Sequence, residues 1–81
     1  MVSKQNRRIL RNLGAKIHEE RLAKGYSQSE LAERTGLSRY YIGSIEHGSK
    51  NISLSVFRDI ARALHGKSWR WLKDAEAIDA A

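Results

Sequence analysis

The stretch from residue 27 to residue 48, SQSELAERTGLSRYYIGSIEHG, most constrains what this chain can fold into, because it specifies two short helices joined by a tight turn. Ser27 is a favourable N-cap, and Glu30 three residues later can complete a capping box. Gly36 ends the first helix, since glycine adopts the left-handed backbone conformation without a steric penalty. Ser38 then caps a second helix, which a further glycine ends.

The second of these helices has two different faces. Ile42 and Ile45 are spaced to point inward. Small, polar and aromatic side chains remain on the outer face, namely Arg39, Tyr40, Gly43, Ser44 and His47. An ordinary helical hairpin would show the same caps, so the pattern alone leaves open whether the outer face binds anything.

The stretch resembles the helix-turn-helix of the Cro and lambda-repressor type, the XRE-like family of bacterial and phage regulators. The residues that carry the resemblance are Arg21, Tyr26-Ser27-Gln28, Glu30-Leu31-Ala32, Gly36-Leu37-Ser38, Tyr41-Ile42, Ile45-Glu46 and Gly48, followed by Ile60-Ala61 and Ala63-Leu64. The resemblance implies an all-α fold, a compact five-helix lambda-repressor-like DNA-binding domain. We therefore expect residues 1–81 to form a single helix-turn-helix domain. The helix-turn-helix itself spans about 27–48, and the last helix spans about 68–79.

Composition agrees with such a domain. A chain of 81 residues can form one hydrophobic core that is only just large enough to stabilise the fold. Association with a second copy of the chain is therefore expected on size alone. Its 15 Lys and Arg against nine Asp and Glu give a charge of +6, which favours polyanionic partners. The absence of cysteine excludes disulfides and thiolate metal sites. Without a membrane-length apolar run or a signal-peptide core, the chain is expected to be cytoplasmic, with no membrane partner.

Hydrophobic spacing predicts the helices that flank this motif. A first helix runs from Lys4 or Arg7 to Lys24. Its apolar stripe consists of Ile9, Leu13 and Ile17, flanked by Leu10 and Leu22. Four basic side chains off the stripe are expected to form a solvated face rather than to contact DNA, namely Arg7, Arg8, Arg11 and Lys16. Of these, Arg7 and Arg8 are the two that could reach the DNA backbone. Ser53 caps a later helix that Gly66 ends. The core stripe of that helix consists of Phe57, Ile60, Ala61 and Leu64.

The last helix begins near Ser68 and carries two apolar stripes. Trp69 and Leu72 share one face, whereas residues two apart do not, so Trp71 points elsewhere. Trp71 aligns with Ala75 and Ile78. This second stripe either contacts the chain's own core or forms the interface of a homodimer. We favour the homodimer, because so small a domain has little core to cover it.

The resemblance also implies roles on the outer face of the second motif helix. In register with the family, Arg39 and Tyr40 contact base edges and Ser44 does so one turn later. Arg39 can bond guanine O6 and N7 together. Residues expected at the DNA backbone are Gln28, Ser38, Tyr41, His47, Lys50 and Asn51. Arg21 and Glu46 match positions that form a structural ion pair, whose loss would damage folding before recognition.

The function implied is sequence-specific transcriptional regulation by a homodimer on a pseudo-palindromic operator in double-stranded DNA. Where the family often has proline, this chain has Asn51-Ile52-Ser53-Leu54, which resembles the controller proteins of restriction-modification systems. Such a controller activates at low occupancy and represses at high occupancy. Activation requires contact with RNA polymerase, and Glu33 matches the acidic patch that some relatives use.

Other functions were weighed against this one. A phage-type repressor, an antitoxin or another protein-interaction module can share the fold. An enzyme is not expected, because His18, His47 and His65 lack an acidic or nucleophilic partner at a recognisable spacing. No catalytic residue, cofactor or metal cluster is predicted.

Overall fold

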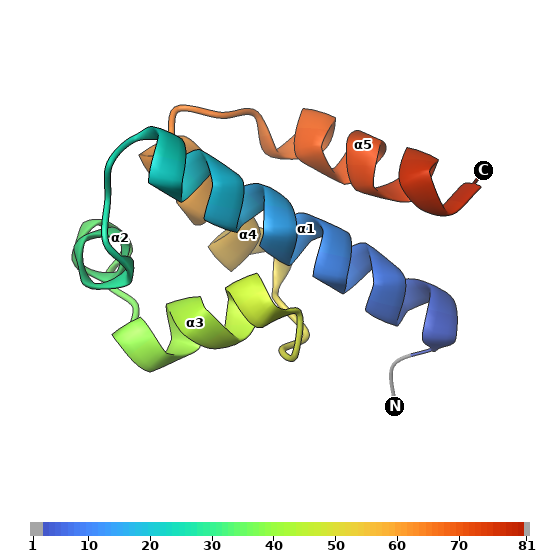
Figure 1. Ribbon diagram of the computed structural model, residues 1–81, viewed down its shortest axis with the longest axis horizontal. Coiled ribbons are helices and arrows are strands. Elements are labelled where there is room, and N and C mark those ends of the chain that lie inside the picture. The colour runs from blue at the N-terminus through green and yellow to red at the C-terminus, as the bar shows by residue number, and fades with distance from the viewer. Residues whose placement is uncertain (1–2, 81) are drawn as a thin grey trace.

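Five helices follow one another along the chain, and the all-α prediction is confirmed (Figure 1). The computed structural model describes the backbone of residues 3–80 and the side chains of 3–4 and 6–77. The helices are α1 (Lys4–Ala23), α2 (Gln28–Thr35), α3 (Arg39–His47), α4 (Leu54–Ala63) and α5 (Ser68–Ala80).

A serine stands before each of the first four helices and closes its N-terminal turn. Each hydroxyl oxygen accepts a hydrogen bond from the backbone amide three residues later, at 3.1 Å from Asn6, 3.0 Å from Glu30, 3.0 Å from Tyr41 and 3.2 Å from Val56. The Ser27 amide also donates to the Glu30 carboxylate at 2.9 Å, which completes the predicted capping box. Each cap stabilises its helix by about 1 kcal/mol.

Glycine ends two of the helices as predicted, and a third ends differently. Gly36 and Gly48 have φ angles of 73° and 79° at the ends of α2 and α3. Helix α4 stops at Ala63, and the positive φ after it, 60°, belongs to His65. The predicted stop at Gly66 is therefore wrong. That glycine leaves room for an aromatic ring, since a Cβ there would lie 2.1 Å from Trp71 Cζ2.

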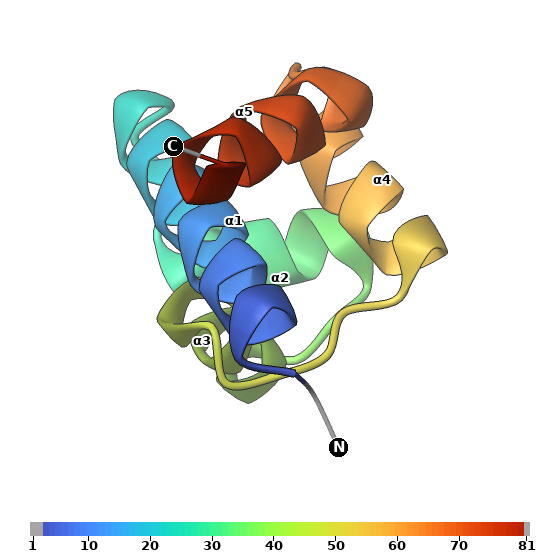
Figure 2. The same ribbon diagram turned by 90° about the vertical axis from the view of Figure 1, so that its right-hand side faces the viewer.

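Helix α1 lies between α3 and α5, which Figure 2 shows on its opposite sides. Gly14 allows the close approach to α3, because a Cβ there would lie 2.4 Å from the carbonyl oxygen of Ile45. On the other side, Asn12 Nδ2 donates to the carbonyl oxygen of Ala75 at 3.1 Å. The central position of α1 thus fixes both α3 and α5.

The core gathers apolar side chains from all five helices. The largest fully buried ones are Ile17, Leu31, Ile42, Ile60 and Leu64. Each such side chain stabilises the fold by about 1.5–3 kcal/mol through removal from water. Leu22, predicted beside the α1 stripe, is instead 56% exposed, because it lies on the solvent side of the last turn of α1.

Helix α5 corrects the predicted homodimer interface. Trp71 and Ala75 are only 5% and 3% exposed, so they are buried within the chain. The Trp71 ring lies 6.4 Å from the ring of Phe57. Trp69 is 60% exposed instead. The side chain of Ile78 lies outside the described residues. Two of the three interface residues therefore belong to the core, because α1 and α4 leave a space for a tryptophan that helical periodicity cannot reveal.

Candidate nucleic-acid interface

Helices α2 and α3 cross steeply at the turn between them. Figure 1 shows α2 nearly end-on where α3 runs across the view. Leu37 is half-buried against the core, and its amide donates to the carbonyl oxygen of Ala32 at 3.0 Å. Ile42 and Ile45 are buried on the inner side of α3. The opposite side of α3 consequently faces solvent.

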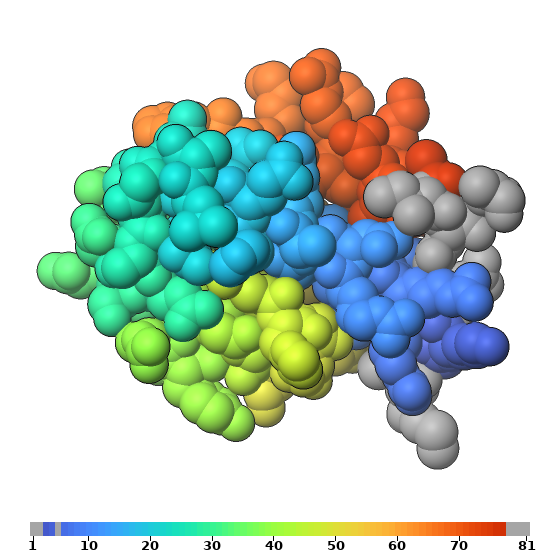
Figure 3. All heavy atoms as spheres, in the orientation of Figure 1, coloured from blue at the N-terminus to red at the C-terminus, as the bar shows by residue number. Residues whose placement is uncertain are grey.

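The outer side of α3 lies at the lower edge of the molecule in the space-filling view (Figure 3). Arg39 and Tyr40 are exposed there, and 77% of the Tyr40 surface is accessible. One hollow is lined by Gln28, Arg39, Tyr40, Gly43, Ser44 and His47. The structure therefore brings together all three predicted base-contacting residues and two of the predicted backbone-contacting residues.

Two serines of this surface already make hydrogen bonds within α3. Ser44 Oγ donates to the carbonyl oxygen of Tyr40 at 3.1 Å, so its oxygen remains free to accept. Ser38 Oγ accepts from the Tyr41 amide at 3.0 Å, so its proton remains free to donate. A phosphate oxygen suits the donor at Ser38, and the amino group of adenine or cytosine suits the acceptor at Ser44.

Gln28 begins α2 and faces the middle of α3. Its Nε2 donates to Glu46 Oε1 at 3.2 Å. The amide side chain lies beside Gly43, where an added Cβ would lie 3.6 Å from Gln28 Oε1, an ordinary van der Waals separation. Packing within the chain therefore does not require glycine at position 43.

Arg21 and Glu46 form the ion pair that the resemblance implied. Arg21 Nε lies 2.6 Å from Glu46 Oε2, and Arg21 Nη2 lies 3.0 Å from Oε1. Arg21 Nη1 also donates to the carbonyl oxygen of Tyr26 at 2.7 Å. The two charged side chains are 7% and 5% exposed. This bidentate pair ties α1 to the end of α3.

The pair changes the ionisation of both groups. Burial raises the pKa of the Glu46 carboxyl, but hydrogen bonds from Arg21, His18 and Gln28 together outweigh burial and hold that pKa below its ordinary value. The hydrogen bond to Glu46 raises the pKa of Arg21, and burial opposes this only in part. Both groups are therefore charged at neutral pH.

His18 is a member of this cluster that the sequence analysis missed. Its Nδ1 lies 2.8 Å from Glu46 Oε1 and 3.1 Å from Arg21 Nη2. Sequence spacing indicated no acidic partner for His18, and the structure supplies one, Glu46, from another helix 28 residues along the chain. One signal was available, since residues three apart on a helix share a face and any partner of Arg21 also lies near His18.

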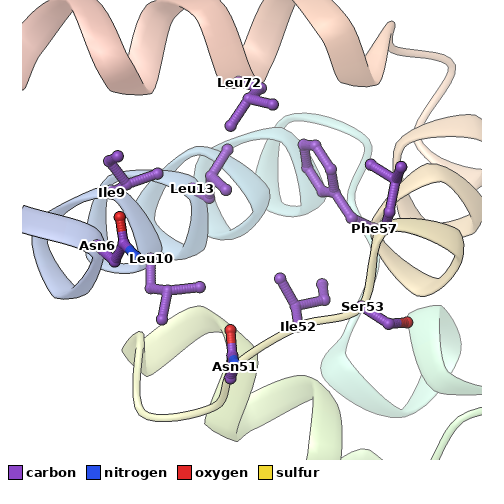
Figure 4. Close-up of a pocket in the computed structure, with 10 residues that line it drawn as sticks. Asn6, Ile9, Leu10, Leu13, Asn51, Ile52, Ser53, Phe57 and Leu72 are labelled. Atoms are coloured by element: carbon purple, nitrogen blue, oxygen red, sulfur yellow. The ribbon is translucent and has the colours of Figure 1, made fainter. Parts of the chain in front are cut away.

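The loop after α3 is held at both ends. The amide and hydroxyl of Ser49 donate to the carbonyl oxygen of Ser44 at 3.1 and 3.2 Å. Figure 4 shows Ile52 pointing toward α1 between Leu10 and Phe57, where it is half-buried. Lys50, one residue after this anchored serine, is exposed.

The other four predicted backbone-contacting residues do not line the hollow on α3, namely Ser38, Tyr41, Lys50 and Asn51. Asn51 lines the space beneath α1 together with Asn6 (Figure 4). Tyr41 is half-buried against the core.

No helix of the described part is long and apolar enough to span a membrane. Within the same part, no group of three or more acidic, histidine or cysteine side chains is arranged to hold a metal ion.

A family model described as helix-turn-helix matches residues 17–72. The chain belongs to this helix-turn-helix family. It is of the XRE type, a family of DNA-binding transcriptional regulators. The match runs from the middle of α1 into α5, so it includes the ion pair, both motif helices and the anchored loop.

Relatives of this helix-turn-helix protein include restriction-modification control proteins. The control protein C.SmaI of Serratia marcescens is 40% identical over 53 residues, which cover 65% of this chain and 63% of C.SmaI, less than two thirds of its length. The crystal structure of the controller protein C.AhdI from Aeromonas hydrophila superposes with a TM-score of 0.72 at 41% identity, covering 78% of this chain and 94% of that one. The controller protein C.Esp1396I was crystallised as a tetramer with its natural 35 base-pair operator. Its structure superposes with a TM-score of 0.75 at 26% identity, covering 90% of this chain and 96% of that one.

Proposed function

We propose that this helix-turn-helix protein regulates transcription as a homodimer that binds a pseudo-palindromic operator, and that it controls restriction-modification genes. The observation that carries the proposal is the open outer face of α3 on a rigid scaffold. Arg39, Tyr40 and Ser44 share one hollow there, and the buried pair behind them holds the helix in place. This arrangement supports insertion of α3 into a major groove.

The side chains of this face support direct contact with bases. The Arg39 guanidinium can donate to guanine O6 and N7 together. The exposed Tyr40 ring can pack on a thymine methyl group. Gln28 lines the same hollow, Ser38 caps α3 and Lys50 lies in the loop after it. These side chains would bind phosphate oxygens, which set the register on the duplex.

The relatives support the more specific role. C.SmaI and C.AhdI are control proteins of restriction-modification systems, and C.Esp1396I binds its own operator as a tetramer. By analogy, this chain would bind near the promoters of its own gene and of a restriction endonuclease gene.

We propose Glu33, which is exposed on α2, as a contact to RNA polymerase. Glu33→Lys should then abolish activation in a promoter assay while operator affinity is unchanged; retained activation would exclude the contact.

The homodimer requires a surface other than Trp71 and Ala75. Trp69 is a large apolar side chain that α5 leaves exposed. In a homodimer that covers this side chain, the two α3 helices must lie about 34–36 Å apart to enter successive major grooves. Sedimentation of the wild-type protein and of Trp69→Ser tests this, since the variant should shift toward monomer.

Selection of bound duplexes from a random DNA library at near-physiological salt tests the proposal as a whole. We expect an inverted repeat whose half-site centres lie about one helical turn apart. Recovery of a single half-site would exclude the homodimeric operator. Recovery of no motif would exclude sequence-specific regulation and favour a protein partner, as expected of an antitoxin.

A further inference from the structure

The surface of α1 that faces α3 continues past the end of α3. Gly14, His18 and Arg21 contact α3 through the backbone of Ile45 and the carboxylate of Glu46. These three positions are spaced by four and three residues. The same spacing continued toward the N-terminus reaches Arg11 and then Arg7. Figure 1 shows α1 extending beyond the last turn of α3 in this direction.

Arg11 lies directly over the end of α3. A Cβ at Gly48 would lie 2.7 Å from Arg11 Cγ and 2.8 Å from Arg11 Cα. The side chains of Arg7 and Arg11 are both exposed. Lys50, two residues beyond Gly48, is exposed as well. Basic side chains of α1 and of the loop after α3 therefore flank the same end of the proposed DNA-binding helix.

The basic residues in the N-terminal half of α1 are unfavourably placed with respect to the helix dipole and to one another. The first turn of α1 contains no acidic residue, although the positive end of a helix dipole favours one there. Arg7 and Arg11 are like charges one helical turn apart, which repel each other. Among the described side chains neither arginine has a carboxylate partner within 4.0 Å, whereas Lys16 further along α1 pairs with Glu20 at 3.3 Å. Departures of this kind from local electrostatics are typical of functional sites.

Two segments of the chain carry most of its net positive charge. Of the 15 basic residues, six lie in 4–11 and 39–50, and the other nine equal the nine acidic residues in number. Glu46 is the one carboxylate in these two segments, and Arg21 neutralises it. The six residues are Lys4, Arg7, Arg8, Arg11, Arg39 and Lys50. With Glu46 counted, these two segments carry +5 of the formal charge of +6.

We propose that Arg7 and Arg11 form a phosphate clamp that binds the DNA backbone beside the groove occupied by α3. This inference rests on the proposed DNA binding and adds contacts from residues outside the segment 17–72 that the family model covers. The clamp contributes affinity and register and no base preference, because phosphates are the same at every sequence.

The test compares Arg7→Gln/Arg11→Gln with wild type at a series of salt concentrations. The probes are the duplex recovered by selection and a random-sequence duplex of equal length, with binding followed by fluorescence anisotropy. Each lost phosphate contact reduces the slope of log affinity against log salt by about 0.9, so the variant slope should be shallower by about 2 for each bound protomer. Affinity for both duplexes should fall by the same factor. Arg7→Lys/Arg11→Lys should keep the wild-type slope, since lysine also binds phosphate.

The matched control is Arg58→Gln/Arg62→Gln, which removes the same charge from an exposed arginine pair with the same four-residue spacing on α4, away from α3 and from Trp69. Its slope should equal that of wild type. An unchanged slope in the arginine variant, or an equal loss in the control, would overturn the clamp while DNA binding stands. A wild-type protein that binds neither duplex would overturn both proposals. Thermal unfolding monitors the fold, and Arg7→Gln alone should still reduce the slope by about 1 for each bound protomer.

Discussion

The two faces of α3 differ in how fully their side chains are engaged. On the inner face Ile42 and Ile45 are buried, and the Glu46 carboxylate accepts hydrogen bonds from three side chains of α1 and α2. On the outer face Arg39 and Tyr40 are exposed and make no ion pair within the described part of the chain. One short helix is thus held by one face and left free to bind with the other. Substitutions on the two faces should therefore separate stability from DNA binding.

The largest effect is expected on the inner face. Arg21→Met leaves the buried Glu46 carboxylate without its charge partner and should lower the free energy of unfolding by about 3–5 kcal/mol. Lys16→Met removes only the surface pair with Glu20, at 3.3 Å, and should cost about 0.2–0.5 kcal/mol. Urea unfolding followed by circular dichroism measures both. Equal losses of unfolding free energy in the two variants would show that burial of the Arg21–Glu46 pair does not increase the cost of breaking it.

The next effect is expected on the outer face. Arg39→Ala should remove about 1–3 kcal/mol of preference for one base in each half-site while the melting temperature stays constant. Lys50→Ala should weaken binding to all sequences alike and reduce the salt slope by about 1 for each bound protomer. Competition binding with single-base operator variants distinguishes them. If the two variants behaved alike, the assignment of base and phosphate contacts would be wrong.

Two helical glycines sharpen the comparison further. Gly43→Ala should raise the free energy of unfolding by about 1 kcal/mol, since alanine favours the helix and its Cβ meets only the Gln28 side chain, at 3.6 Å. It should also weaken operator binding, because the methyl group stands on the face that approaches DNA. Gly14→Ala should destabilise, because its Cβ would lie 2.4 Å from the Ile45 carbonyl oxygen. Thermal unfolding measures the stability of both variants, and fluorescence anisotropy measures their binding to the operator. A Gly43→Ala variant with wild-type operator affinity would show that α3 does not need glycine at position 43 to approach the DNA closely.

The smallest and most gradual effect is expected from acid. Hydrogen bonds from Arg21, His18 and Gln28 outweigh burial and lower the pKa of Glu46 below 4.5, and the Ser27 amide and hydroxyl lower that of Glu30. A carboxyl whose pKa is lowered by folding stabilises the protein above its unfolded pKa and loses this contribution as pH falls through its folded pKa. Stability should therefore be constant near neutral pH and decline below about 4.5.

Urea unfolding at a series of pH values measures this decline. Arg21→Met should show a smaller decline, because it removes the bonds from arginine that lower the Glu46 pKa. A stability that rises on acidification would contradict the assignment.

Helix boundaries were predictable because their signals are local. Ser27, Ser38 and Gly36 act within one helical turn of their own positions, so caps and stops follow from the chain itself. Pairings between helices were less accessible. The partner of Arg21 came only from the family resemblance, and His18 was missed because its contact to Glu46 spans 28 residues.

Sequence alone determined the five helices, the inward direction of Ile42 and Ile45, and the exposed composition of the opposite face, because helical period and capping depend on neighbours along the chain. Tertiary structure decided which tryptophan of α5 is buried. Trp71 fills the space beside Gly66 and Phe57, whereas Trp69 stays at the surface. It also decided that Arg11 crosses the end of α3, because only the packing of α1 at Gly14 sets where its N-terminal turns lie.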